Sequence, residues 1–136
     1  MQFYDIFNGD ADGLCALQQL RLEDPRRSVL VTGAKREIAL VERVAPGVGD
    51  ELTVLDLSFK VNARAVARAL DAGARCRYFD HHFPGDVPQH PNLRTFIDTA
   101  SDVCTSLIVD RYLSGRQRIW AVVAAFGDNL VKSAQR

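Results

Sequence analysis

The stretch Arg77-Tyr78-Phe79-Asp80-His81-His82-Phe83-Pro84-Gly85 decides how the rest of this sequence is interpreted. Its apolar part, with Cys76 close by, predicts a buried strand, and Pro84-Gly85 predicts a turn in the loop behind it. An acid and two histidines therefore stand at the end of a strand, where they offer oxygen and nitrogen ligands for a divalent metal. The alternative is a turn with a capping acid and two solvated histidines, and this stretch alone does not choose between them.

Two further predicted strands also end in acidic side chains. Residues 2–7 form a β-prone run that continues into Asn8-Gly9-Asp10-Ala11-Asp12-Gly13, and residues 51–55 form a second run that Asp56 closes. The carboxyl ends of parallel strands line one edge of an α/β sheet, so we expect these acids to converge with Asp80-His81-His82. Four carboxylates in one place repel one another unless a cation neutralises them, and a two-metal site is the simplest explanation.

Predicted helices alternate with these strands. Leu14, Leu17 and Leu20 mark a helix that begins at Asp12-Gly13, and its free N–H groups would suit an incoming phosphate. Asp12 could instead serve only as the N-cap of that helix. Other segments complete the pattern: strands over residues 28–32 and 93–97, and helices over residues 36–44, from Asn62 as N-cap to Gly73, from Ser101 as cap to Gly115, and over residues 119–126. The alternation predicts an α/β fold with a mainly parallel sheet of about five strands, helices on both faces, and the metal site at the carboxyl ends of the strands.

Several apolar side chains outside the strands are expected to pack in the interior. The last predicted helix carries an apolar face at helical spacing, formed by Ile119, Val122, Val123 and Phe126, so Trp120 is expected to pack rather than to stack on a ligand. The three cysteines, Cys15, Cys76 and Cys104, are isolated among apolar neighbours, which indicates buried thiols in a reducing compartment.

Taken in order, the acidic motifs resemble those of the DHH phosphoesterases over almost the whole chain. Residues 8–13 resemble the first motif, Asp56 the second and Asp80-His81-His82 the triplet that names the family, while Gly127-Asp128-Asn129 resembles the fourth, acidic motif. Each motif alone is weak, whereas the ordered set is specific. The resemblance implies a metal-dependent phosphoesterase that hydrolyses a phosphodiester or phosphate ester of a nucleotide or short oligonucleotide.

The same resemblance implies a set of metal ligands. Asp56 would bridge two ions of Mn²⁺ or Mg²⁺, Asp10 would bind one of them, and the other would be bound by Asp12, His81 and Asp128. A carboxylate-rich site with one imidazole suits these ions better than zinc.

The family resemblance implies different roles for the remaining members of the triplet. Asp80 would orient a neighbouring group or ligate beside the other acids, and His82 would contact the scissile phosphate as a cation or general acid. Adjacent residues of an extended chain point in opposite directions, which would suit separate roles for His81 and His82.

Two features depart from the family pattern. Many members carry a histidine shortly before the Asp-x-Asp pair, whereas Ile6-Phe7-Asn8-Gly9 has none, so the first ion would be weakly held. Asn8 could contribute an oxygen ligand or could simply form a turn with Gly9. Members also continue into a smaller C-terminal domain that holds the substrate, and its absence after Asp128 predicts either a fragment or a minimal form. A non-catalytic metal- or phosphate-binding module therefore competes with the enzyme, and an inorganic pyrophosphatase ranks lower because that branch also has the leading histidine.

The composition sets the remaining expectations. The 136 residues are long enough for one domain over residues 1–136, and 17 basic against 17 acidic side chains leave no net charge to attract nucleic acid or a membrane. No leader opens the chain and no apolar run approaches the ~20 residues that span a bilayer. We therefore expect a cytoplasmic protein with a nucleotide or short oligonucleotide as its partner; the sequence does not decide whether it forms a homodimer.

Overall fold

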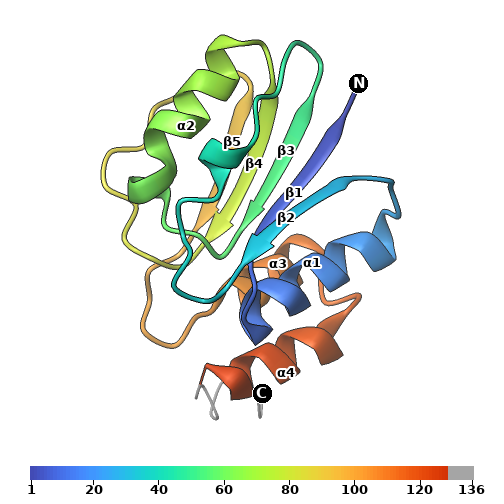
Figure 1. The fold of residues 1–136 in the computed structure, drawn as a ribbon. Helices are drawn as coiled ribbons and strands as arrows, with labels where there is room; N and C mark the ends of the chain where they lie inside the picture. The colour runs from blue at the N-terminus through green and yellow to red at the C-terminus, as the bar shows by residue number, and fades with distance from the viewer. Residues whose placement is uncertain (129–136) are drawn as a thin grey trace.

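The fold is built on five parallel strands. The computed structural model describes residues 1–128, and its strands are β1 (Phe3–Asn8), β2 (Val29–Gly33), β3 (Glu51–Leu55), β4 (Arg75–Asp80) and β5 (Leu93–Ile97). They form one sheet in the order β2-β1-β3-β4-β5, and every neighbouring pair is parallel (Figure 1). The predicted mainly parallel sheet of about five strands is therefore confirmed.

Helices cover both faces of this sheet, as expected for parallel strands, which are hydrophobic on both sides (Figure 1). One face carries α2 (Phe59–Asp71) and the short 3-10 helix η1 (Val41–Arg43). The other carries α1 (Ala11–Glu23) and α3 (Thr105–Tyr112), and α4 (Arg118–Gly127) packs on α1 and α3 as an outer layer. No helix among residues 1–128 is long and apolar enough to cross a membrane.

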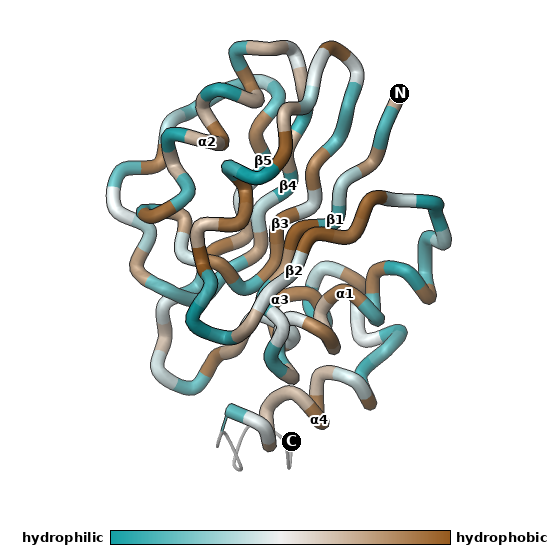
Figure 2. The backbone as a smooth tube through the Cα atoms, in the orientation of Figure 1, coloured by the Kyte–Doolittle hydropathy of each residue, from teal (hydrophilic) through white to brown (hydrophobic). Residues whose placement is uncertain are grey.

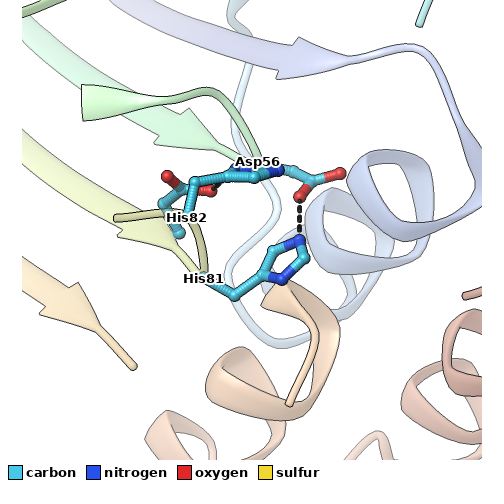
Figure 3. Close-up of side chains that lie close together, drawn as sticks. Asp56, His81 and His82 are labelled. Carbon is cyan, nitrogen blue, oxygen red and sulfur yellow. Dashed lines mark hydrogen bonds and ion pairs between the residues drawn. The ribbon is translucent and has the colours of Figure 1, made fainter. Parts of the chain in front are cut away.

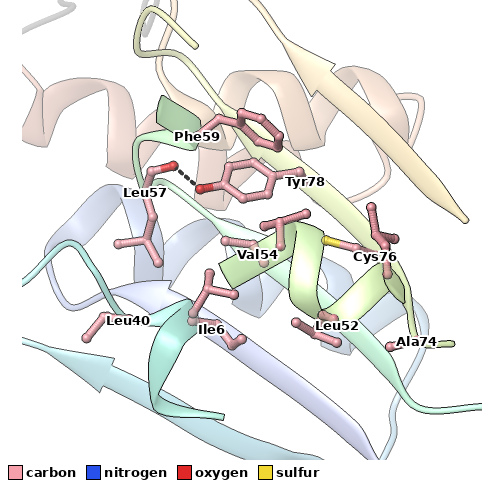
Figure 4. Packing of buried hydrophobic residues seen from close by; sticks show 13 residues of the cluster. Ile6, Leu40, Leu52, Val54, Leu57, Phe59, Ala74, Cys76 and Tyr78 are labelled. Carbon is pink, nitrogen blue, oxygen red and sulfur yellow. Dashed lines mark hydrogen bonds between the residues drawn. The ribbon is translucent and has the colours of Figure 1, made fainter. Parts of the chain in front are cut away.

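Alternation along the strands divides the core into two layers. Ile6, Val54 and Tyr78 are in register on neighbouring strands and face α2, where the Tyr78 hydroxyl donates a hydrogen bond to the Leu57 carbonyl at 2.6 Å (Figure 4). The residues one position later in each strand face α1 and α3; these are Phe7, Leu55 and Phe79. Burial of these side chains on both faces fixes the strand register, and with it the place where each strand ends.

The edge strand β2 is less covered than the central strands. It carries the apolar run Val29-Leu30-Val31, which stands out in the hydropathy view (Figure 2), yet Leu30 remains 61% exposed.

Two expectations about the middle of the chain are wrong. Residues 36–44 form no helix apart from η1, and α2 begins before Asn62, with Ser58 as its N-cap. Asn62 instead lies buried inside α2, where its amide nitrogen donates to the Ile38 carbonyl and its oxygen accepts from the Val41 N–H. The side chain thus satisfies backbone groups that a helix would otherwise have paired.

Two expectations about the C-terminal helices are also wrong. Helix α3 begins at Thr105 rather than at a cap formed by Ser101. In α4 most of the face expected in the core is turned outward, since Ile119 is 71% and Phe126 50% exposed and only Val122 packs inward, while the buried positions are Ala121, Ala124 and Ala125. Small side chains let α4 approach α1 closely, which larger ones would prevent.

The expectations for the cysteines and the tryptophan agree with the structure. The three thiols are free and buried, and burial raises the pKa of Cys76 to about 12. Trp120 packs against the small cluster that contains Cys15 and Cys104.

Candidate metal centre

The predicted site residues converge at the carboxyl edge of the sheet. The loop after β1 supplies Asp10 and Asp12, the end of β3 supplies Asp56, the end of β4 supplies Asp80-His81-His82, and the end of α4 supplies Asp128. Several of these side chains line one pocket of about 360 Å³, together with Asn8, Lys35, Ile38, Ser58 and Gly127. Asn129 of the predicted fourth motif lies outside the described residues.

Asp56 occupies the centre of this edge. Its backbone is left-handed, with φ at +64°, and its N–H donates to the Phe79 carbonyl at 2.9 Å, which turns the side chain toward the neighbouring acids. The carboxyl is only 2% exposed, and burial, followed by the nearby charges of Asp12 and Asp10, raises its pKa to about 10. The cluster therefore strongly favours a proton on Asp56 or a cation beside it.

Two of the predicted ligands reach the acidic cluster from other segments. The Nε2 atom of His81 lies 3.2 Å from Asp56 Oδ1 (Figure 3) and 3.7 Å from Asp12 Oδ2, so this imidazole contacts two carboxylates. Asp128 joins the same neighbourhood from the C-terminal end of α4. Burial, and then the charge of Asp12, raises the pKa of Asp128.

The loop after β1 differs from its predicted form. Helix α1 begins at Ala11 with Asp10 as its N-cap, because Asp10 Oδ1 accepts a hydrogen bond from the Gly13 N–H at 3.0 Å. Asp12 is therefore not the cap of its own helix. It is buried, and its two carboxylate oxygens accept hydrogen bonds from the backbone N–H groups of Thr105 and Ser106 at 2.9 and 2.8 Å, at the start of α3.

Asn8 ties two loops together. Its side-chain oxygen accepts from the Asp10 N–H at 3.1 Å, and its amide nitrogen donates to the Lys35 carbonyl, also at 3.1 Å. The first of these bonds belongs to an Asx turn, one of the two roles that the sequence left open for Asn8. The second holds the loop after β2, and with it Lys35, at the edge of the pocket.

Asp80 and His82 form a second pair of groups. The Nδ1 atom of His82 lies 2.7 Å from Asp80 Oδ1, and this hydrogen bond raises the pKa of His82. Asp80 is fully buried, and its Oδ2 atom has no hydrogen-bond partner among the described residues. Since a buried carboxylate oxygen without a partner is costly, this atom is explained by a cation or a proton.

The expected opposition of the two histidines is wrong. Strand β4 ends at Asp80, so the chain is no longer extended where His81 and His82 follow, and their ring centroids lie only 4.3 Å apart. The two rings nevertheless meet different acids: His81 contacts Asp56 (Figure 3), and His82 contacts Asp80.

These donors fit a divalent cation. Residues 1–128 contain two groups of side chains whose potential ligand atoms all lie within 4.8 Å of one another inside the group. One group is Asp56, Asp80, His81 and His82, and the other is Asp12, His81 and Asp128. The second group is the set expected from the family resemblance for one ion. Asp10 lines the pocket but belongs to neither group.

The sequence did not single out Lys35, Thr105 or Ser106 as site residues. The hydroxyl of Thr105 donates to Asp56 Oδ1 at 3.0 Å, and that of Ser106 donates to the Asp12 carbonyl at 2.8 Å. A threonine and a serine ahead of a helical apolar pattern are a capping signal, which could have marked this helix start. Nothing local marks Lys35, which reaches the pocket only through the packing of its loop.

Comparison with known proteins rests on structure. No protein-family model matches the sequence, and no curated protein matches it. A crystal structure of the exonuclease RecJ bound to manganese superposes with a TM-score of 0.55 at 17% identity, and RecJ from Thermus thermophilus in complex with Mn²⁺ gives 0.51, also at 17%. The chain has the fold of one part of RecJ.

These superpositions cover 98% and 93% of this chain, but only 42% and 21% of the two RecJ chains. The chain thus spans less than half the length of each RecJ structure. RecJ is a member of the DHH family, so the predicted resemblance is confirmed at the level of the fold.

Proposed function

We propose that this chain is a divalent-metal-dependent phosphoesterase that hydrolyses a phosphodiester or phosphate ester of a nucleotide or short oligonucleotide. One observation carries the proposal: acids and histidines from four separate segments meet at one pocket with their charges uncompensated. Asp80 Oδ2 is buried without a partner among the described residues, and the pKa of Asp56 rises to about 10. Ionisable groups with strongly shifted pKa values are concentrated at functional sites.

Manganese or magnesium would be held by the acids and the histidine of this site. Asp12, His81 and Asp128 would hold one ion, and Asp56 and Asp10 would hold a second. When bound, such ions supply an activated water and neutralise charge on the phosphate. The two RecJ structures that share this fold both contain manganese.

The chain's own side chains would bind and orient the phosphate. His82 is 48% exposed at the pocket, and Asp80 holds its ring from behind through the 2.7 Å contact. Because this contact raises the pKa of His82, the ring stays protonated to a higher pH and can offer a cation or a proton to a phosphate oxygen. Lys35 adds a second cation to the wall of the pocket.

A manganese titration with bis(p-nitrophenyl) phosphate and with a dinucleotide tests the proposal. We expect the wild-type chain to turn over as Mn²⁺ saturates the site, and His82→Ala to lose turnover while it still binds Mn²⁺. A chain that binds Mn²⁺ without hydrolysing either compound would be a non-catalytic module instead. Pyrophosphate is tested as a third substrate. If the chain hydrolyses pyrophosphate and neither of the other two compounds, the pyrophosphatase alternative is favoured.

The finer expectations from the sequence belong to the same proposal. They are the substrate class, the count of two ions, the cytoplasmic location and the question of a homodimer. Since the chain covers less than half of either RecJ chain, turnover by this chain is itself part of the proposal, and the manganese titration tests it.

A further inference from the structure

The start of α3 contacts two of the strand-end acids at once. The Thr105 hydroxyl donates to Asp56 Oδ1 at 3.0 Å, while the Thr105 N–H donates to Asp12 Oδ2 at 2.9 Å. Thr105 is fully buried. Asp12 and Asp56 follow different strands, so a single residue links two segments that each bring a carboxylate to the site.

The position of Thr105 is imposed by the rest of the helix terminus. Cys104, the residue before α3, provides no side-chain cap, and Asp12 supplies that cap from another helix by accepting from both Thr105 and Ser106. Two further bonds anchor the terminus to α1. The Ser106 hydroxyl donates to the Asp12 carbonyl at 2.8 Å, and the Gln19 amide donates to the Ser106 carbonyl at 3.0 Å.

This anchoring gives the Thr105 hydroxyl a fixed target. The oxygen that accepts its hydrogen bond, Asp56 Oδ1, is also the atom that lies 3.2 Å from His81 Nε2. The hydroxyl therefore sets the direction of the Asp56 carboxylate relative to His81. Groups that hydrogen-bond to ligating carboxylates in this way tune metal affinity strongly.

We propose that Thr105 is a positioning residue of the metal centre, whose hydroxyl orients Asp56 for a divalent cation. This inference rests on the proposed function, since it assigns a role toward the same ions. It adds a residue that belongs to neither group of potential ligand atoms and to none of the acidic motifs.

The test compares Thr105→Val with Thr105→Ser. Valine has nearly the shape of threonine and keeps the backbone N–H to Asp12, but it removes the hydroxyl, whereas serine keeps both. Titration of free Mn²⁺ by electron paramagnetic resonance should show a ten- to hundredfold loss of affinity for Thr105→Val, about the range typical of such supporting groups. Thr105→Ser should bind within about twofold of wild type, which is the rescue that a positioning role requires.

Ser106→Ala is the matched control, because it removes a buried hydroxyl at the next position that bonds to the backbone carbonyl of Asp12 rather than to a carboxylate oxygen of the site. Its Mn²⁺ affinity should stay near that of wild type even if its unfolding midpoint falls. If Thr105→Val does not fold, Thr105→Ala replaces it in the same comparison. If a folded Thr105 variant without the hydroxyl binds Mn²⁺ as tightly as wild type does, the positioning role of Thr105 is refuted and the proposed function is not. If the wild-type chain does not bind Mn²⁺ at all, both are refuted.

Discussion

Replacing Asp56 with asparagine separates its role toward a metal from its effect on folding. Asparagine has the same shape and tolerates the left-handed backbone at this position. Its oxygen can still accept from Thr105, and its amide can donate to the Asp10 carboxylate that lies against Asp56. We therefore expect the Asp56→Asn variant to fold, and to lose Mn²⁺ binding because the central negative charge is gone.

The metal-free stability of this variant should exceed that of wild type in a pH-dependent way. The pKa of Asp56 is 3.8 in an unperturbed chain and about 10 in the fold, so the folded state holds the proton more tightly. Wild-type stability therefore falls as pH rises from 3.8 toward 10, and asparagine, which cannot ionise, avoids this loss. At about 1.36 kcal/mol per pH unit, the advantage of the variant is near zero at about pH 4 and reaches up to about 4 kcal/mol at about pH 7.

Urea denaturation at pH 4, 5.5 and 7 in the presence of a chelator measures this difference. Asp50→Asn is the control: hydrogen bonds from the Gly47 and Gln2 N–H groups lower the pKa of Asp50, so this variant should gain no stability as pH rises. A lower unfolding free energy for Asp56→Asn than for wild type at pH 7, or a difference that does not grow with pH, would refute the account of Asp56 as a crowded, uncompensated acid.

Two more predictions concern the metal centre, and a third concerns Asn62 of α2. His81→Ala should weaken Mn²⁺ binding and reduce the stabilisation by Mn²⁺ by RT ln of the affinity change. His82→Ala should keep that stabilisation but bind phosphate roughly tenfold to a hundredfold more weakly. Equal losses of Mn²⁺ binding in the two variants would contradict separate roles for the two histidines. Mn²⁺ binding at pH 7 should release about one proton, because Asp56 must lose its proton to bind the ion. Calorimetry in two buffers of different ionisation enthalpy measures the number of protons released, and no release would contradict the prediction. Asn62→Ala should lower the free energy of unfolding, measured in urea, by about 2–4 kcal/mol, since it leaves the Ile38 carbonyl and the Val41 N–H unpaired. Its Mn²⁺ affinity should not change. A change in that affinity would show instead that the loop before η1 supports the metal site.

The fold was largely predictable because its main signals are local in the chain. Each strand is an apolar run that ends in polar residues, and the runs alternate with segments of helical spacing, so a parallel sheet with covered faces follows. The failures share a cause. Residues 36–44 have helical spacing, but the Asn62 side chain satisfies two of their backbone groups. Most of the apolar face of α4 points outward because the small residues of that helix pack inward instead. Both outcomes depend on the neighbouring element that packs there.

The metal site, too, has one part that the sequence predicts and another that depends on tertiary packing. The placement of Asp56, Asp80 and His81 followed from their positions at strand ends, because parallel strands bring their carboxyl ends to one edge. The use of each acid did not follow. A helix can be capped by any acceptor within reach, and only the packed chain shows that Asp10 caps α1 while Asp12 caps α3.

By itself, the sequence determined which residues meet at the edge of the sheet, since period-two burial and the end of each run are properties of consecutive residues. The tertiary structure alone decided how those residues are held: the contact between Asp12 and Thr105 joins positions 93 residues apart, and the loop of Lys35 is held by Asn8 across 27 residues. Hydrogen bonds require donor and acceptor within about 3 Å, and at such separations only the packing of α1, α3 and the sheet brings them that close.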